Sequence, residues 1–238
     1  MSLGWPIPPP RPRVTKTPEI FRKEREAMVA RLEREGFLKS PRLKRAMLKV
    51  PRELFVPKQY ADYAYEELPF PLPGNGRNQT ISCPHSYPLF YEALKLNEGD
   101  RFLEVGTGSG YGAALAREVV GSKGLVVTVE INPATYKFAK SNLDKLGYKD
   151  VIVILGDGSL GYSPLAPYNK ICVTAACPKI PPPLIEQLSP NGRLVAPVGY
   201  PNSVQDLILL EKLSSGKLRT SKIDEVLYVP LKGKYGWA

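Results

Sequence analysis

Short apolar runs alternate with longer segments of helical period between residues 101 and 157. The runs are FLEV (102–105), LVVTVEI (125–131) and VIVIL (151–155), and they are rich in β-branched residues. The segments between them repeat their apolar residues at the spacing of an amphipathic helix. Strands that alternate with helices in this way build a mostly parallel sheet. We therefore expect an α/β fold with a small-molecule site at the strand ends.

The flanking segments complete the predicted architecture. Thr17-Pro18-Glu19 and Ser40-Pro41 have the residues of helix starts, and basic amphipathic helices are expected after each. Residues 171–173 and 193–198 predict further strands, and 206–213 and 225–231 predict an antiparallel pair that closes the sheet. The predicted fold is a doubly wound, Rossmann-like, mostly parallel seven-stranded sheet with helices on both faces, preceded by N-terminal helices.

A glycine-rich turn follows the first apolar run and indicates a nucleoside-bearing ligand. It reads Gly106-Thr107-Gly108-Ser109-Gly110, and a helix is expected to begin near Tyr111. Glycines allow the backbone to approach a ligand closely, and the N–H groups of the next helix point into the turn. The third glycine of a dinucleotide motif is missing, because Tyr111 occupies its position, and the chain has no phosphate-loop motif.

Three carboxylates at strand ends restrict further the chemical class of the expected ligand. Glu130 stands 24 positions after Gly106 (130 − 106), where this architecture places an acceptor for ribose hydroxyls. Glu104 lies within the apolar run, and there it suits the amino group of an amino-acid-bearing nucleoside better than a pyrophosphate. Asp157-Gly158 follows the third run, and we assign Asp157 to the adenine amino group. The alternative for each is a solvated or capping carboxylate, which is the weaker interpretation for Glu104.

Residues 72–85 form a polar loop that no packing argument requires. The loop is rich in Gly, Pro, Asn and hydroxyl-bearing residues, so we expect it to bury little surface. Its glycines and prolines are also typical of simple turns. It leads directly into an amphipathic helix with Leu89, Phe90, Ala93 and Leu94. We therefore expect the loop to lie over the mouth of the cofactor pocket.

Several motifs, in this order, resemble the protein-L-isoaspartate O-methyltransferases, which are class I S-adenosylmethionine-dependent enzymes. They are VPRELFVP (50–57), QTISCPH (79–85), EVGTGSGY (104–111), GDG (156–158), GRLVAPVG (192–199) and YVPL (228–231) with Trp237. The resemblance covers roughly residues 20–238, and QTIS is its diagnostic part because many methyltransferases share the glycine motif. Two features depart from the family: Arg77-Asn78 precede Gln79, and Cys83 replaces the more usual Ala or Gln.

The resemblance implies methyl transfer from S-adenosylmethionine to the free α-carboxylate of L-isoaspartyl residues in damaged proteins, with S-adenosylhomocysteine as the product. The ester then collapses to a succinimide without the enzyme, and hydrolysis returns some normal aspartate. A carboxyl of this kind has a pKa near ~3.5, so it is already ionised at neutral pH and needs no general base. The protein has to place the oxygen in line with the methyl carbon and to exclude water.

The resemblance also implies roles for individual residues. Ser82 is the expected catalytic residue, because its hydroxyl can donate to the substrate carboxylate, and Thr80, Ile81 and His85 are expected to bind substrate with it. The alternatives are a helix-capping Ser82 and a packed or capping His85. The full set of expected cofactor contacts is Gln79, Thr80, Ser82, His85, Glu104, Gly106, Thr107, Gly108, Ser109, Gly110, Glu130, Ile131, Asp157 and Gly158.

The composition is that of an ordinary soluble globular chain of 238 residues, with 43% hydrophobic and 24% charged residues. No apolar run reaches membrane-spanning length, and the proline-rich start does not match a secretory signal, so we expect a cytoplasmic protein. The three cysteines are expected to be reduced thiols. His85 is the only histidine and the chain has no C-x-x-C motif, which excludes a multi-histidine metal site, and no metal is expected.

The net charge of +10 is concentrated near the start of the chain. Residues 1–60 hold 15 Lys and Arg against 6 Asp and Glu, whereas the remainder holds 18 against 17. A nearly neutral catalytic body does not attract phosphates strongly. We therefore expect isoaspartyl-containing proteins and peptides as partners of a monomer, without nucleic acid or membrane. The rivals are a class I methyltransferase for RNA or a small metabolite, and a non-catalytic binding module.

The chain divides into three expected parts. Residues 1–16 form a Pro-rich basic extension, and residues 17–100 form helices and a substrate loop that pack on the core. Residues 101–238 form the S-adenosylmethionine-binding core.

Overall fold

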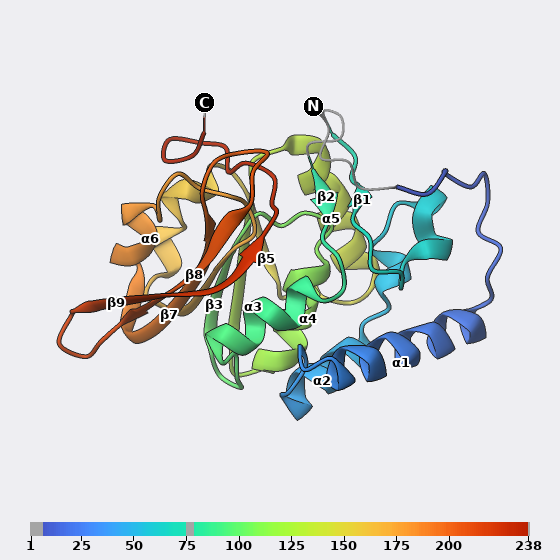
Figure 1. Ribbon diagram of the computed structural model, residues 1–238, viewed down its shortest axis with the longest axis horizontal. Coiled ribbons are helices and arrows are strands. Elements are labelled where there is room, and N and C mark those ends of the chain that lie inside the picture. Colours follow the sequence, from blue (N-terminus) through green and yellow to red (C-terminus); the bar gives the residue numbers. More distant parts are fainter. Residues whose placement is uncertain (1–6, 75–78, 238) are drawn as a thin grey trace.

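A seven-stranded sheet forms the centre of the molecule, with the order β5-β4-β3-β6-β7-β8-β9 (Figure 1). The computed structural model describes residues 7–74 and 79–237. The strands are β3 (Arg101–Val105), β4 (Leu125–Glu130), β5 (Ile152–Leu155), β6 (Tyr168–Val173), β7 (Leu188–Val198), β8 (Gln205–Lys212) and β9 (Leu218–Val226). The pairs among β3 to β7 are parallel, and the β7–β8 and β8–β9 pairs are antiparallel. This topology confirms the predicted fold class.

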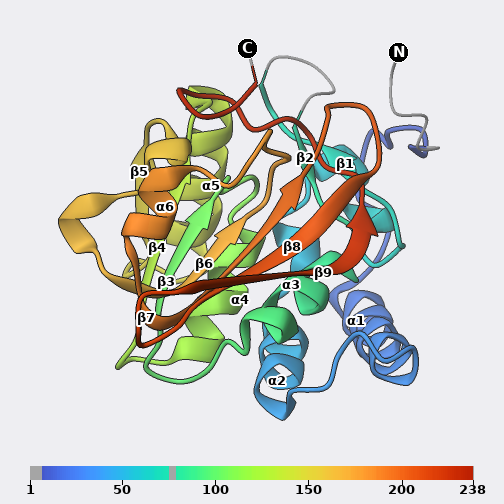
Figure 2. The same ribbon diagram turned by 60° about the vertical axis from the view of Figure 1, so that its left-hand side comes forward.

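Helices cover both faces of the sheet, as Figures 1 and 2 show. The helices α3 (Ser86–Leu94), α4 (Tyr111–Val120) and α5 (Pro133–Lys145) pack over a core that contains Phe102 and Cys172. The short helix α6 (Pro182–Glu186) packs on the other face, over Leu103 and Ile171. Successive residues of a strand point to opposite faces, so Phe102 and Leu103 belong to different cores.

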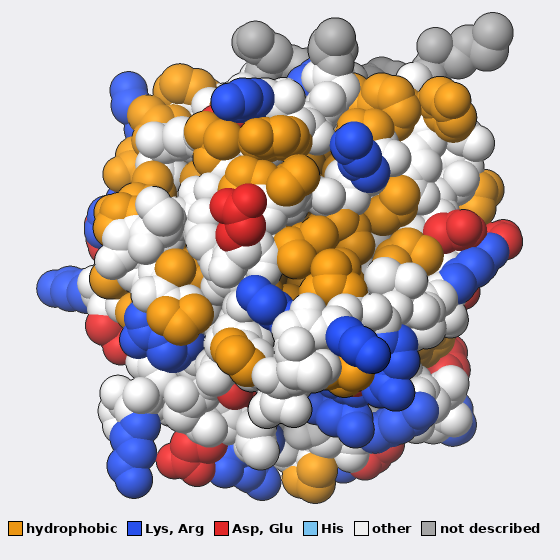
Figure 3. All heavy atoms as spheres, turned by 90° about the vertical axis from the view of Figure 1, so that its left-hand side faces the viewer, with side chains coloured by type: hydrophobic (Ala, Val, Ile, Leu, Met, Phe, Trp, Pro, Cys, Tyr) orange, Lys and Arg blue, Asp and Glu red, His pale blue; other side chains and the backbone are white. Residues whose placement is uncertain are grey.

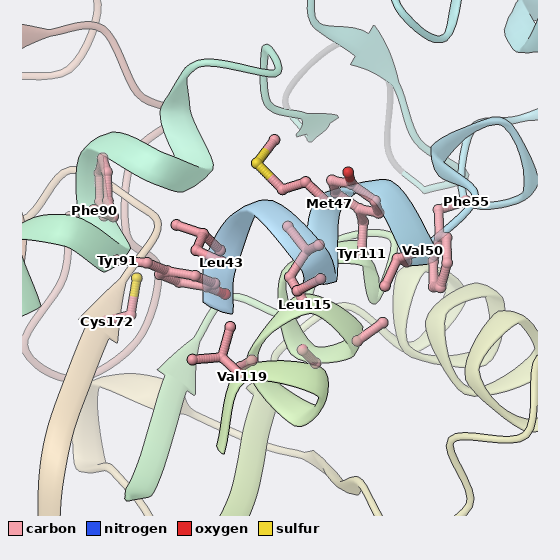
Figure 4. Close-up of a cluster of buried hydrophobic side chains, with 14 of the residues drawn as sticks. Leu43, Met47, Val50, Phe55, Phe90, Tyr91, Tyr111, Leu115, Val119 and Cys172 are labelled. Atoms are coloured by element: carbon pink, nitrogen blue, oxygen red, sulfur yellow. The ribbon is translucent and has the colours of Figure 1, made fainter. Parts of the chain in front are cut away.

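Two N-terminal helices extend the larger core. They are α1 (Pro18–Arg34) and α2 (Pro41–Lys49), and the hydroxyls of Thr17 and Ser40 cap their first turns as the sequence predicts. Figure 4 shows Leu43 and Met47 of α2 beside Leu115 and Val119 of α4, and all four side chains are buried. Two 3₁₀ turns follow, η1 (Arg52–Leu54) and η2 (Lys58–Tyr63).

The position of the last strand corrects the sequence prediction. We expected it at 225–231, but β9 spans Leu218–Val226 and lies at the open edge of the sheet. Almost all of its residues are exposed, so it lacks the alternating apolar pattern that identifies a strand. The apolar residues 228–231 instead leave the sheet, where Pro230 forms a bridge with Ala176 and Leu231 is buried.

The part of the Pro-rich extension that the structure describes lies on η2. The Arg11 guanidinium donates to the Asp62 carboxylate at 3.0 Å and to the Tyr63 hydroxyl at 2.9 Å. Thr15 donates its hydroxyl to Asp62 at 2.6 Å. Burial raises the pKa of Asp62, but hydrogen bonds from Thr15, Lys16 and Arg11 outweigh it and hold the pKa at about 2.

None of the helices in residues 7–74 and 79–237 has both the length and the apolar character needed to cross a bilayer.

Candidate active site

The glycine turn between β3 and α4 has a backbone that requires glycine. Gly106, Gly108 and Gly110 have φ values of +96°, +56° and +87°. The Thr174 hydroxyl, just after β6, donates to the Gly106 carbonyl at 2.8 Å, and a Cβ on Gly106 would lie 2.4 Å from that hydroxyl. Thr174 therefore supports the turn from the neighbouring strand.

Glu130 joins the glycine turn to the polar loop. Its side chain is buried at the end of β4, and one carboxylate oxygen accepts the Gly108 N–H at 3.1 Å. The other oxygen accepts from the Asn132 N–H at 3.0 Å and from the Gln79 side chain at 3.2 Å. Burial raises the pKa of Glu130, while these hydrogen bonds oppose the rise. The structure thus brings Gln79, Gly108 and Glu130 together, and Ile131 beside them is 40% exposed.

Glu104 is a buried carboxylate, not a solvated or capping one. It is 2% exposed and accepts a hydrogen bond from the Thr128 hydroxyl at 2.7 Å. The Thr128 hydroxyl lies 2.8 Å from that of Thr107, so a chain of hydroxyls connects Glu104 to the glycine turn. Burial raises the pKa of Glu104 to about 8, and in the described parts of the chain no ion pair involves it. A Cβ on Gly112 would lie 2.3 Å from its carboxylate.

The polar loop lies against the glycine turn, and its expected place over the mouth of a cofactor pocket stays a prediction. The strands β1 (Phe70–Pro71) and β2 (Thr80–Ile81) pair within it. A Cβ on Gly108 would lie 3.5 Å from the Leu72 side chain and 3.9 Å from the Thr80 carbonyl. The expectation that the loop buries little is wrong, because Leu72, Ile81 and Cys83 are all buried. The Arg77-Asn78 insertion lies outside the described residues.

The Ser82 side chain meets the C-terminal part of the chain. Burial keeps the pKa of Tyr228 above its ordinary value, and hydrogen bonds with the Ser86 and Ser82 side chains partly lower it. The N-cap residue of α3 is His85, and no side chain caps the helix. The capping alternative for Ser82 is therefore wrong. Tyr228 belongs to a motif that the sequence flagged, but its contact with Ser82 was not foreseen.

Arg52 positions the segment that carries Ser82. Its guanidinium is fully buried and donates to the Ala64 and Ser82 carbonyls, both at 2.7 Å. It also lies over the Tyr111 ring, at 5.3 Å from the centroid. Its neighbour Glu53 pairs with Arg25 at 3.3 Å, and none of the ion pairs among the described residues includes Arg52. The charge of Arg52 is therefore held beside the Ser82 backbone without a carboxylate partner.

His85 is held by residues that precede the loop. Its Nδ1 lies 2.6 Å from a Glu67 carboxylate oxygen, which also accepts the His85 backbone N–H at 3.1 Å. The ring packs against Phe37 at a centroid distance of 5.3 Å. These contacts are those of a packed histidine, and a substrate or cofactor role for His85 stays a prediction.

Asp157 caps the short turn η4 (Gly158–Leu160). Its carboxylate accepts from the Ser159 N–H at 2.9 Å and from the Lys234 N–H at 2.7 Å. The capping alternative is confirmed for this residue, and its role toward adenine stays a prediction. A Cβ on Gly158 would lie 2.6 Å from Val105, so glycine is required for close packing on β3.

The comparisons with known proteins agree over nearly the whole chain. Two curated proteins named protein-L-isoaspartate O-methyltransferase are similar to it. The Hyperthermus butylicus protein is 47% identical, with 94% of each chain covered. Enzyme 2 of Archaeoglobus fulgidus is 49% identical over 91% of this chain and 96% of its own.

Two solved structures share the fold. One, named protein-L-isoaspartate O-methyltransferase, has a TM-score of 0.82 and 34% identity, over 89% of this chain and 67% of its own. A Plasmodium falciparum protein in complex with S-adenosyl-L-homocysteine has a TM-score of 0.76 and 22% identity, over 87% of this chain and 98% of its own. The family described as protein-L-isoaspartate(D-aspartate) O-methyltransferase matches residues 23–236. The chain therefore belongs to the protein-L-isoaspartate(D-aspartate) O-methyltransferase family.

Proposed function

We propose that the protein transfers the methyl group of S-adenosylmethionine to the free α-carboxylate of L-isoaspartyl residues in damaged proteins and peptides. The observation that carries this proposal is the path of the polar loop. Its Gln79 side chain bonds to Glu130, and its Thr80 carbonyl lies over Gly108, so the loop borders the glycine turn. A methyl donor in the turn and a carboxylate on Ser82 would then be neighbours.

The residues at the turn fit this cofactor. Bound S-adenosylmethionine would supply a methyl group that the positive charge on its sulfur activates. Glu130 has carboxylate oxygens for ribose hydroxyls, and the positive φ angles of the turn allow close backbone approach. Glu104 is a buried carboxylate, and no ion pair among the described residues includes it. The hydroxyls of Thr107 and Thr128 connect it to the glycine turn, so the ammonium group of a cofactor bound there would favour its ionised form. We assign Asp157, Gly158 and Ile131 to the adenosine end.

Ser82 and Arg52 would place the substrate. The Ser82 hydroxyl lies near Tyr228, whose pKa it lowers, and it can donate to a substrate carboxylate. The guanidinium of Arg52 holds the Ser82 carbonyl and contributes positive potential where an anionic carboxylate has to bind. Since the nucleophile is already ionised, these residues need only orient it and exclude water.

Charge pairing speaks against RNA as the substrate. Many cations of the basic N-terminal quarter are paired with carboxylates, including Arg31 with Glu67, Lys44 with Glu33 and Lys49 with Glu118. Figure 3 shows the face at the β9 end of the sheet, where apolar side chains lie in the upper part and Lys and Arg side chains gather at the lower right. Paired charges of this kind release few counterions on binding a phosphate backbone.

A direct test incubates the protein and labelled S-adenosylmethionine with each of three acceptors and measures the label transferred to each. An isoaspartyl peptide should be methylated, whereas its normal aspartyl twin and RNA should not. Equal labelling of both peptides, or labelling of RNA alone, would refute the proposal.

The role of Ser82 is tested against its neighbour Ser86, because both serine side chains lie near Tyr228 and lower its pKa. Ser82→Ala removes a hydrogen bond to a charged substrate group, so turnover should fall about 10- to 100-fold with little change in cofactor binding. Ser86→Ala should have a much smaller effect. Equal losses in the two variants would show that the contact with Tyr228, and not the substrate carboxylate, explains the result.

A further inference from the structure

We propose that Glu67, Cys83 and His85 form a binding site for a divalent transition metal of the zinc class. A carboxylate oxygen, the Cys83 sulfur and a His85 ring nitrogen all lie within 4.8 Å of one another. In a tetrahedral zinc site with bonds of about 2.0–2.3 Å, ligand atoms are about 3.3–3.8 Å apart. Small side-chain rotations would therefore bring the three atoms onto one ion. The site is argued from its own geometry, although it uses His85, for which a substrate or cofactor role stays a prediction.

The contact between His85 and Glu67 marks the position of the ion. The His85 Nδ1 and a Glu67 oxygen are 2.6 Å apart, and a metal would replace the proton that they share. The other Glu67 oxygen accepts from Arg31 at 2.6 Å. The first oxygen accepts the His85 backbone N–H at 3.1 Å and keeps a second lone pair for the ion. An outer partner of this kind orients a metal-binding carboxylate.

The surroundings of Glu67 and Cys83 set the charge that an ion would meet at this site. Burial raises the pKa of Glu67, but hydrogen bonds with His85 and Arg31 hold it at about 2, so the group is ionised at neutral pH. Burial, and then the Glu67 charge, raise the pKa of the Cys83 thiol to about 11. A metal that binds the Cys83 sulfur would displace the thiol proton.

The ligand set and its exposure favour zinc, cobalt or copper over magnesium and calcium. One sulfur, one imidazole nitrogen and one carboxylate oxygen form a soft to intermediate donor set. The His85 and Glu67 side chains are 33% and 32% exposed, so an ion can enter from solvent and a water molecule can complete its coordination. A single histidine excludes a multi-histidine site, but it does not exclude this mixed one. The bound ion would tie the segment next to Ser82 to Glu67 and, through Arg31, to α1.

Cobalt(II) titration of the full-length, metal-free protein tests the proposal without cofactor or substrate. We expect one equivalent to bind with a thiolate-to-cobalt absorption band, and zinc to abolish the band by competition. Cys83→Ser should lose the band. The matched control is Cys177→Ser, because Cys177 is also a buried thiol and donates to the Pro197 carbonyl at 3.3 Å; this variant should retain the band. Glu67→Gln and His85→Asn should each weaken binding at least tenfold.

Two results would overturn the proposal: no band in the unaltered protein, or a band that survives in Cys83→Ser. Folding of each variant is checked by cooperative thermal unfolding. A measurement on the unaltered protein avoids the variants altogether, since saturating zinc should raise its unfolding temperature and a chelator should reverse the rise. An unfolding temperature that zinc leaves unchanged would also refute the site.

Discussion

Replacing Arg52 with lysine tests whether its guanidinium holds the Ser82 segment. The guanidinium is fully buried and donates from Nε to the Ala64 carbonyl and from Nη2 to the Ser82 carbonyl, both at 2.7 Å. A lysine keeps the charge, but its single ammonium cannot reproduce this two-sided fork or stack on Tyr111. One hydrogen bond from a charged donor would be lost, at a cost of about 1.5–3 kcal/mol, and a buried carbonyl would be left without a partner.

Thermal unfolding and steady-state kinetics measure the effect. In a chain of this size 1 kcal/mol changes the unfolding temperature by about 2–4 °C, so Arg52→Lys should lower it by about 3–12 °C. The matched control is Arg45→Lys, because Arg45 is exposed on α2, and it should change stability by less than about 0.5 kcal/mol. Turnover of an isoaspartyl peptide should also fall in Arg52→Lys alone. An unfolding temperature equal to that of Arg45→Lys would refute the positioning role.

Three further predictions concern the carboxylates and the N-terminal extension. Burial raises the pKa of Glu104 from 4.5 to about 8, so in the cofactor-free protein the free energy of unfolding should fall as pH rises between these values. Glu104→Gln should abolish that part of the fall in urea unfolding, and identical pH profiles would contradict the assignment. Glu130→Gln removes the negative charge that accepts from the Gly108 N–H and would accept from the ribose hydroxyls. Calorimetry should therefore show an affinity for S-adenosylmethionine at least about tenfold weaker. An unchanged affinity would exclude Glu130 from the site. Deleting residues 1–16 removes the partners of Asp62 and should lower the unfolding temperature while methylation of short peptides continues, and loss of that activity would show that the extension shapes the site.

The sequence predicts well those features that depend on neighbouring residues. The turn from Gly106 to Gly110 needs positive φ angles, and only glycine adopts them cheaply, so the motif and the backbone correspond directly. Thr17 and Ser40 cap helices within their own first turns. Glu130 could be placed because parallel strands end at one edge of the sheet, whatever the details of packing. In each case the physical cause lies within a few residues or one strand.

The contacts that complete the candidate site have causes far from them in the chain. Glu67 bonds to His85, Lys234 bonds to Asp157, and Tyr228 lies near Ser82. No local pattern connects the members of these pairs. The sequence also gives the wrong position for strand β9, for a related reason. Hydrogen bonds with β8 hold this strand in the sheet, and its exposed residues have no apolar pattern that would identify it.

The sequence around Arg52 contains a pattern from which its burial could have been predicted. It stands in a proline-bracketed segment without helical period, yet Val50, Phe55 and Val56 around it are apolar, and all three are buried. A segment that is apolar but neither helix nor strand leaves backbone carbonyls without regular partners, and a guanidinium can satisfy several of them at once. The Ala64 and Ser82 carbonyls are satisfied in this way. An arginine within an apolar, irregular segment therefore indicates a buried cation that organises nearby loops, and here the loop is the one that carries Ser82.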